Sequence, residues 1–286
     1  MKKLIVIGDS TTANYGEASF PQQGWAYYLK EYVKEGIEVK NFGWGGASLK
    51  TFLYSKEYIN AKSEINEPEK SYWNSTILPE VSEGNIVIFY WAGINDMLQG
   101  GFDSFRPRQG GAYVRDWQNT SKESYIWIGE GLGTHEFFTV RSEIQEMKKL
   151  LGKMILQIQD RGANIVIVKG TGKYYPVHEQ DNNVVAVNRE YADAVLEVAK
   201  NCGIEHYDMG GYLNQEFMQY GYKKTMEKFL LPITVVQKGR LEKGIEKAVP
   251  TVDDNVHYNC QGARLICQHL VAQMKENNGL LKEILQ

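Results

Sequence analysis

The chain has 286 residues, of which 43% are hydrophobic and 23% charged, close to the average of globular proteins, and this excludes a disordered or fibrous chain. Its 32 lysines and arginines against 35 aspartates and glutamates give a net charge of −3, which offers no general attraction for nucleic acid or anionic lipid. The longest apolar run, Ile86 to Ile94, is about half the ~20 residues of a membrane helix. We therefore expect neither nucleic acid nor a membrane as a partner.

The basic start and the cysteines bear on the compartment. Only Leu4 to Ile7 form an apolar stretch after Met1-Lys2-Lys3, far short of the ~7–15 residues in a secretory signal peptide. The three cysteines, without a CxxC pair, argue against a disulfide framework or a zinc knuckle. We expect a cytoplasmic protein with reduced thiols, although a secreted protein written without its signal peptide would look the same.

Apolar runs and helical spacings alternate along the chain. Strands are predicted at 4–7, from 37–39 onward, and at 86–91, 164–168 and 204–207, and helices at 25–33, 140–158, 184–198 and 265–274. This alternation predicts right-handed crossovers and a parallel sheet with helices on both faces. Two stretches, about 98–138 and 212–249, interrupt it. The sequence has no linker or repeat, so we expect a single domain, 1–286, with two insertions.

Polar residues of catalytic type follow the predicted strands or precede the last helix. They form four segments: Gly8-Asp9-Ser10-Thr11, Asn41 to Gly46, Gly93-Ile94-Asn95-Asp96 and Asp254-Asn255-Val256-His257. Each segment alone has an ordinary explanation as a helix cap or a turn. In parallel sheets, however, ligands bind at the carboxyl ends of the strands. The four segments together therefore predict a catalytic site at that edge.

The residue types match the chemistry of acyl transfer. Ser10 can act as a nucleophile once a base takes its proton, and His257 is suited to that task near neutral pH. Asp254, three residues before His257, can fix the histidine tautomer, whereas Asp253 fits this role less well. The developing oxyanion needs preorganised donors, which the N–H groups of Ser10 and Gly46 and the amide of Asn95 can supply.

This combination of motifs resembles the SGNH (GDSL) hydrolases, and within them the rhamnogalacturonan acetylesterases. The subgroup resemblance rests on Ser10-Thr11-Thr12, on Asn41 five residues before Gly46, and on the His257-Tyr258-Asn259-x-x-Gly262-Ala263 stretch. One position departs: Ile94 stands where such acetylesterases commonly carry histidine.

The resemblance implies a fold, a site and a reaction. The fold is a flavodoxin-like α/β/α arrangement of three layers with a five-stranded parallel sheet. Ser10, Asp254 and His257 would form the triad, and Ser10, Gly46 and Asn95 the oxyanion hole. The implied reaction is removal of acetyl groups from a small carbohydrate, such as an acetylated pectic oligosaccharide, through an acyl-enzyme, with no cofactor and no metal.

Other functions fit the sequence less well. The run Gly43-Trp44-Gly45-Gly46-Ala47-Ser48 lacks the third glycine of a dinucleotide fingerprint. No Gly-x-Ser-x-Gly elbow is present, and the remaining histidines lack metal-ligand spacing. A lipase or thioesterase of the same superfamily remains an alternative, and an inactive carbohydrate-binding module a remote one. The sequence leaves the oligomeric state open.

The first insertion is rich in aromatic and arginine residues. We predict that Arg115, Trp117 and Trp127 contact the substrate, because aromatic faces stack on sugar rings and arginines bind carboxylates. The alternative is that these aromatics form a small core of their own.

Overall fold

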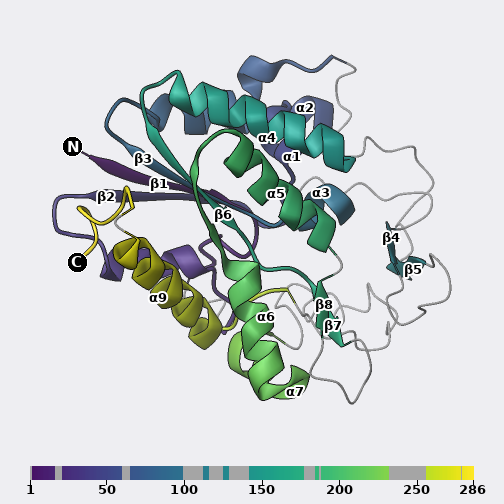
Figure 1. Cartoon of the computed structure of the whole chain (residues 1–286). Coiled ribbons are helices and arrows are strands. Elements are labelled where there is room, and N and C mark those ends of the chain that lie inside the picture. The colour runs from purple at the N-terminus through teal and green to yellow at the C-terminus, as the bar shows by residue number, and fades with distance from the viewer. Residues whose placement is uncertain are drawn as a thin grey trace.

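A five-stranded parallel sheet forms the centre of the molecule (Figure 1). The computed structural model describes residues 2–16, 21–59, 65–98, 112–115, 125–128, 142–176, 184–186, 188–231, 256–277 and 279–286. The strand order is β2-β1-β3-β6-β9, and every neighbouring pair is parallel. The strands are β1 (Lys3–Gly8), β2 (Glu38–Gly43), β3 (Ile86–Trp91), β6 (Asn164–Lys169) and β9 (Glu205–Asp208). The predicted parallel α/β sheet is confirmed.

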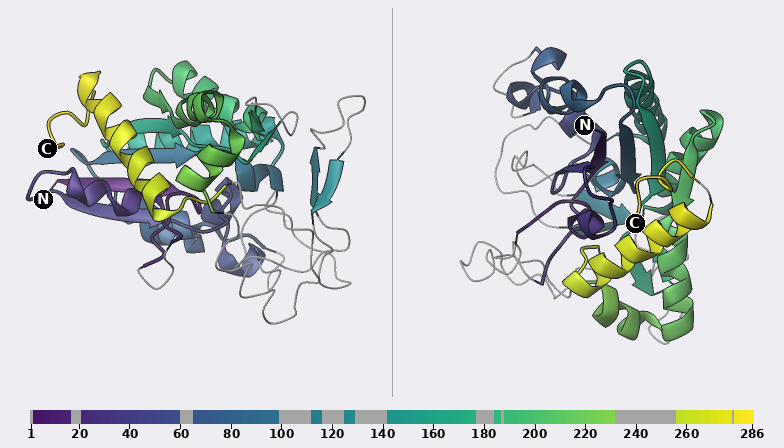
Figure 2. Two further views of the ribbon diagram at one scale, coloured as in Figure 1. Left: turned by 90° about the horizontal axis from the view of Figure 1, so that it is seen from below. Right: turned by 90° about the vertical axis from the view of Figure 1, so that its left-hand side faces the viewer.

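Helices cover both faces of this sheet, which makes three layers (Figures 1 and 2). On one side lie α1 (Leu49–Leu53), α2 (Lys56–Ile59), α4 (Ile144–Gln159) and α5 (Arg189–Asn201), and on the other α6 (Met209–Tyr220), α7 (Tyr222–Phe229) and α9 (Cys260–Glu276). The α-helix α3 (Ile94–Leu98) follows β3 directly. Short helical turns are η2 (Trp25–Tyr27), η3 (Leu29–Glu31), η4 (Pro68–Lys70), η5 (Trp73–Ile77) and η6 (Leu78–Glu80).

The central strands are buried on both faces, which explains their continuous apolar runs. Successive side chains of a strand point to opposite faces. In β1, Leu4 and Val6 accordingly belong to the core under α9, while Ile5 and Ile7 belong to the core under α4 and α5. All six residues of β3 are buried and divide between the two cores in the same alternating way. The sheet is therefore a rigid platform, and its loops carry the polar residues.

Two of the predicted helices differ in the structure. The segment 25–33 forms two short 3₁₀ turns, η2 and η3, because a spacing of three residues suits a 3₁₀ turn as well as an α-helix. Trp25 and Leu29 are nevertheless buried, as the pattern requires. The start of the predicted helix at 184–198 is instead β8 (Val184–Ala186), which pairs antiparallel with β7 (Tyr174–Pro176). The helix α5 begins only at Arg189.

The two predicted insertions are described in part. The second begins inside α6, and its residues up to 231 include α7, which packs on α6 and α9; residues 232–249 lie outside the described residues. Within the first, β4 (Ala112–Arg115) and β5 (Tyr125–Ile128) form an antiparallel pair. Trp117 and the side chains of Arg115 and Trp127 lie outside the described part, so their role as substrate contacts stays a prediction.

Candidate active site

Ser10 lies on a tight turn at the carboxyl end of β1. The turn is held by Asp9, whose Oδ1 accepts hydrogen bonds from Thr11 N at 2.9 Å and Thr11 Oγ1 at 2.7 Å. The main-chain N–H groups of Thr12 and Ala13 both donate to the Asp9 carbonyl at 3.0 Å. Ser10 itself is 6% exposed. Ser10, the predicted nucleophile, thus lies on a hydrogen-bonded turn at the end of a central strand.

A tyrosine braces the same turn. The Tyr15 hydroxyl donates to the Ser10 carbonyl oxygen at 2.9 Å, and the Tyr15 N–H donates to Gln23 Oε1 at 3.1 Å. The N–H of Gln23 in turn donates to the carbonyl of Tyr258, the residue after His257. Sequence reasoning missed Tyr15 and Gln23, because no motif distinguishes them from ordinary loop residues.

The loop after β2 lies beside the nucleophile turn. Trp44 N donates to the Gly8 carbonyl at 3.0 Å, which joins this loop to the end of β1. Gly46 has a φ of +74°, in the left-handed region that favours glycine. Within the part of the chain that the structure describes, no acceptor takes the main-chain N–H of Ser10 or of Gly46. Both groups can therefore donate to a bound substrate.

Asn95 comes to this loop from the other side. Its Nδ2 donates to the Ala47 carbonyl at 3.0 Å, directly after Gly46. A side-chain amide carries two hydrogens, so the second remains for another acceptor. Three donors of the kind that stabilises an oxyanion thus lie at the ends of β1, β2 and β3, the places predicted for Ser10, Gly46 and Asn95.

His257 is fixed through its main chain and its neighbour. Its carbonyl accepts from Leu231 N at 2.9 Å. The hydroxyl of the fully buried Tyr258 is bonded to the hydroxyl of Tyr90, in β3, at 2.7 Å, and also to that of Thr171, which follows β6. These bonds place His257 at the carboxyl edge of the sheet, the edge that carries Ser10. Sequence reasoning did not foresee the role of Tyr258, because its two partners are remote in sequence.

A buried carboxyl group lies within electrostatic range of His257. Burial raises the pKa of Asp9, while the bonds from Thr11 and the positive charge of His257 act in the opposite direction. Asp254 and its neighbour Asp253 lie outside the described residues. The third member of the triad therefore stays a prediction, whereas Asp9 is a carboxyl group that the structure places in the range of the histidine.

Asp96, next to Asn95, is fully buried. Its Oδ1 accepts from Leu49 N at 3.1 Å and its Oδ2 from Trp91 Nε1 at 2.8 Å. Burial raises the pKa of Asp96 from 3.8 to about 7, although both hydrogen bonds favour the charged form. The unfolded chain therefore loses this proton near pH 4, while the folded chain keeps it until near pH 7.

This difference predicts a pH dependence of stability. Between pH 4 and 7 the folded state binds one proton more at Asp96 than the unfolded state, so stability falls as pH rises. We expect the free energy of unfolding of the wild type, measured against Asp96→Asn, to decrease by up to about 1.4 kcal/mol per pH unit in this window. Urea unfolding at a series of pH values measures this; a difference independent of pH would contradict the raised pKa.

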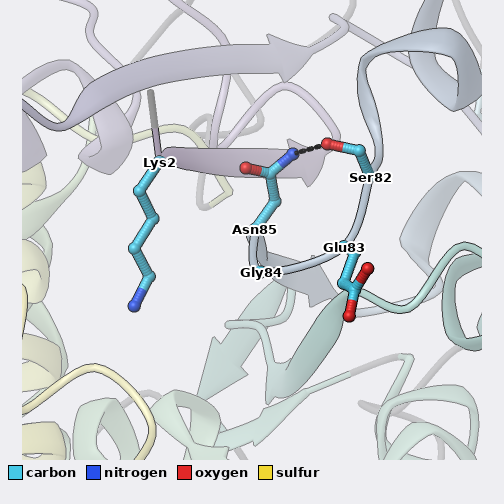
Figure 3. A pocket seen from close by; sticks show the side chains of 5 residues that line it. All are labelled: Lys2, Ser82, Glu83, Gly84 and Asn85. Atoms are coloured by element: carbon cyan, nitrogen blue, oxygen red, sulfur yellow. Dashed lines mark hydrogen bonds between the residues drawn. The ribbon is translucent and has the colours of Figure 1, made fainter.

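The structure also has an open hollow at the opposite edge of the sheet (Figure 3). It has a volume of about 530 Å³ and is lined by Lys2, Ser82, Glu83, Gly84 and Asn85. It lies where β1 and β3 begin, whereas Ser10 and Asn95 follow the ends of these strands. The hollow is therefore separate from the candidate active site.

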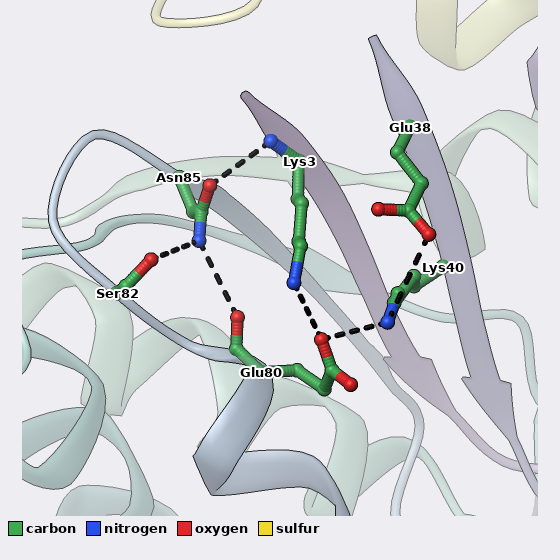
Figure 4. A network of polar contacts seen from close by, with 6 residues as sticks. All are labelled: Lys3, Glu38, Lys40, Glu80, Ser82 and Asn85. Carbon is green, nitrogen blue, oxygen red and sulfur yellow. Dashed lines mark hydrogen bonds and ion pairs between the residues drawn. The ribbon is translucent and has the colours of Figure 1, made fainter. Parts of the chain in front are cut away.

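An ion-pair network lies at this amino-terminal edge (Figure 4). Glu80 pairs with Lys3 of β1 at 2.6 Å and with Lys40 of β2 at 2.7 Å, and the two lysines lower the pKa of Glu80 to about 2. Asn85 joins the network through bonds to the Lys3 N–H and to Ser82. These contacts tie neighbouring strands together and have no place in the chemistry at the other edge.

Among the described residues, no group of three histidine, cysteine, aspartate or glutamate side chains could hold a metal ion. In the same ranges no helix is both long and apolar enough to cross a bilayer.

The structure combines an α/β/α fold with Ser10, His257, Gly46 and Asn95 near the carboxyl edge of its parallel sheet. Comparison with known families agrees: residues 6–230 match the model of the GDSL-like Lipase/Acylhydrolase family, and the chain belongs to this family.

Individual proteins resemble this chain only over a short segment or at low sequence identity. A segment of 66 residues is 35% identical to the probable rhamnogalacturonan acetylesterase YesY of Bacillus subtilis (strain 168); it covers 23% of this chain and only 30% of that relative. Among solved structures, YxiM of Bacillus subtilis superposes with a TM-score of 0.60 at 18% identity, covering 97% of this chain and 57% of YxiM. The acetylxylan esterase Axe2 of Geobacillus stearothermophilus gives 0.52 at 16% identity, covering 96% and 94%. At these identities the two structures show the shared fold.

Proposed function

We propose that the protein is a serine esterase that removes acetyl groups from a carbohydrate. The observation that carries the proposal concerns the main-chain N–H groups of Ser10 and Gly46, which have no acceptor among the described residues. Beside Gly46 lies the amide of Asn95, which uses one of its two hydrogens in the bond to Ala47. Such donors near a serine suit acyl transfer, because its tetrahedral intermediate carries an oxyanion. Membership of the acylhydrolase family supports the same reaction class.

The reaction proceeds in two halves. Ser10 Oγ attacks the acetyl carbonyl carbon while His257 takes the serine proton, and the three donors bind the oxyanion. The intermediate collapses, the bond to the sugar oxygen breaks, and His257 returns the proton to the departing alcohol. Water then attacks the acyl-enzyme by the same route and releases acetate. Asp254 is assigned the role of orienting His257 and stabilising its charged form.

For the alcohol we propose a pectic oligosaccharide of the rhamnogalacturonan type. Two observations support this choice: the similarity to YesY over 66 residues, and the aromatic and arginine residues of segment 98–138. The test is acetate release from acetylated pectin, xylan and chitin oligomers, compared with esters of longer acids. Preference for pectic oligomers is expected, whereas preference for long acyl chains would indicate a lipase of the same family.

The substrate contacts have their own prediction. Trp117→Ala should lower kcat/KM for an acetylated oligosaccharide at least tenfold, equivalent to ~1.4 kcal/mol, and leave para-nitrophenyl acetate hydrolysis nearly unchanged. The reason is that contacts remote from the scissile bond act only on substrates that reach them. Steady-state kinetics on the two substrates decide the matter. Equal losses on both, with a lower melting temperature, would show that Trp117 only packs against its neighbours.

A further inference from the structure

Asp96 is a buried acidic residue that the proposed reaction leaves without a task. Its side chain is 0% exposed, yet it lies directly beside the oxyanion candidate Asn95. A buried carboxyl group costs stability unless hydrogen bonds satisfy its oxygens. Its presence at this position calls for a physical reason.

Residues 95 and 96 each make a hydrogen bond to the chain just after Gly46, and we call this pair of bonds the clamp. Asn95 donates to the carbonyl of Ala47, and Asp96 accepts from the N–H of Leu49, two residues further along, where α1 begins. These two hydrogen bonds join the start of α3 to the loop after Gly46 and to the start of α1. The second oxygen of Asp96 accepts from the indole of Trp91, the last residue of β3.

Both of these partners are donors, which explains the requirement for a carboxyl group. The ionised aspartate presents an acceptor oxygen to each, whereas an asparagine would turn its NH₂ group toward one of them. The main-chain carbonyl of Asp96 also accepts from Ser142 N at 2.9 Å, just ahead of α4. Asp96 thus has bonds to three separate parts of the chain around the oxyanion donors.

We propose that Asp96 is a positioning residue that sets the separation between the two halves of the oxyanion hole, the Gly46 N–H and the Asn95 amide. The proposal rests on the proposed esterase function. Preorganised donors lose much of their effect when they are displaced by about 1 Å, because they no longer fit the transition state. A clamp that fixes this spacing therefore acts on kcat without contacting the substrate.

The test is the kinetics of Asp96→Asn on para-nitrophenyl acetate at pH ~8, where the Asp96 carboxyl group is mostly ionised. We expect kcat to fall at least tenfold while KM stays within about twofold, since ground-state binding uses other contacts. Ile158→Val and Ile158→Ala serve as controls, because Ile158 is fully buried near the far end of α4 and its truncation destabilises the core without touching the clamp. If the controls lost as much kcat for a given loss of melting temperature as Asp96→Asn does, the proposal would be overturned.

Two further measurements separate positioning from folding. Trp91→Phe keeps the carboxyl group but removes one of its donors, and should lower kcat by a smaller factor than Asp96→Asn. In the Asn95→Ala background, Asp96→Asn should cost less than in the wild type, because one of the donors that it positions is already gone. If the loss of kcat in the double variant equalled the product of the two single losses, the positioning role of Asp96 would be contradicted.

The same assays distinguish a failure of the esterase function from a failure of the positioning role. If the wild type shows no hydrolysis that depends on Ser10, the esterase function fails and the positioning role fails with it. If the wild type is active but Asp96→Asn retains full kcat, only the positioning role is overturned.

Discussion

Replacing Ser10 by alanine should abolish ester hydrolysis and leave the fold intact. The loss should be about 10⁴-fold or more, since without the hydroxyl no acyl-enzyme can form. His257→Ala should cause a loss of the same order, because serine and histidine act as one unit. Rates of para-nitrophenyl acetate hydrolysis, with thermal unfolding as a check on folding, measure both. Activity above a few per cent in Ser10→Ala would overturn the assignment of the nucleophile.

The two neighbouring aspartates provide a matched comparison. Asp254→Asn should damage catalysis, whereas Asp253→Asn, the control one residue away, should be mild. The structure adds Asp9, which is buried within electrostatic range of His257. If Asp254→Asn turned out harmless, the carboxylate that stabilises His257 would have to be sought elsewhere, with Asp9 as the first residue to examine.

Removing the Asn95 amide should lower kcat by about 10²–10³, or ~2.7–4 kcal/mol, with a smaller change in KM. The reason is that the amide bonds the developing oxyanion more strongly than the neutral carbonyl of the bound ester. Steady-state kinetics of Asn95→Ala on a small acetyl ester measure how the loss divides between kcat and KM.

Asn95→Ala also removes a hydrogen bond to Ala47, so it needs a control for lost stability. Asn85→Ala is suitable, because this buried asparagine bonds Lys3 and Ser82 at the opposite edge of the sheet. We expect Asn85→Ala to lower the melting temperature and keep kcat. A loss that fell entirely on KM in Asn95→Ala would make Asn95 a binding residue instead of an oxyanion donor.

The strands were predictable because the sheet is buried on both sides. Continuous apolar runs such as 86–91 have few alternatives, and that run is β3 in the structure. Once the strands are parallel, the rule that their carboxyl ends share one edge places Ser10, Gly46 and Asn95 together. The turns at 25–33 were less predictable, because the i, i+3 spacing of Trp25 and Tyr28 serves both α and 3₁₀ geometry.

The supporting contacts could not be predicted in the same way. Asp96 reaches Leu49 and Tyr258 reaches Tyr90 across long stretches of chain, and no local pattern encodes such a pairing. The raised pKa of the buried Asp96 carboxyl group depends on the same tertiary packing. The motifs thus name the groups that would meet the substrate, while the residues that hold those groups become visible only in three dimensions.

The pairing of Leu231 with His257 has a consequence for how such a protein can diversify. The N–H of Leu231 bonds the carbonyl of His257, and Leu230 bridges to Tyr258, so the two residues that flank segment 232–255 are held together. Lengthening a segment between two fixed ends costs little, since the closure entropy rises only with the logarithm of its length. Residues 232–249, which precede Asp254 in this segment, can therefore gain or lose length during evolution while His257, the proposed base, keeps its place.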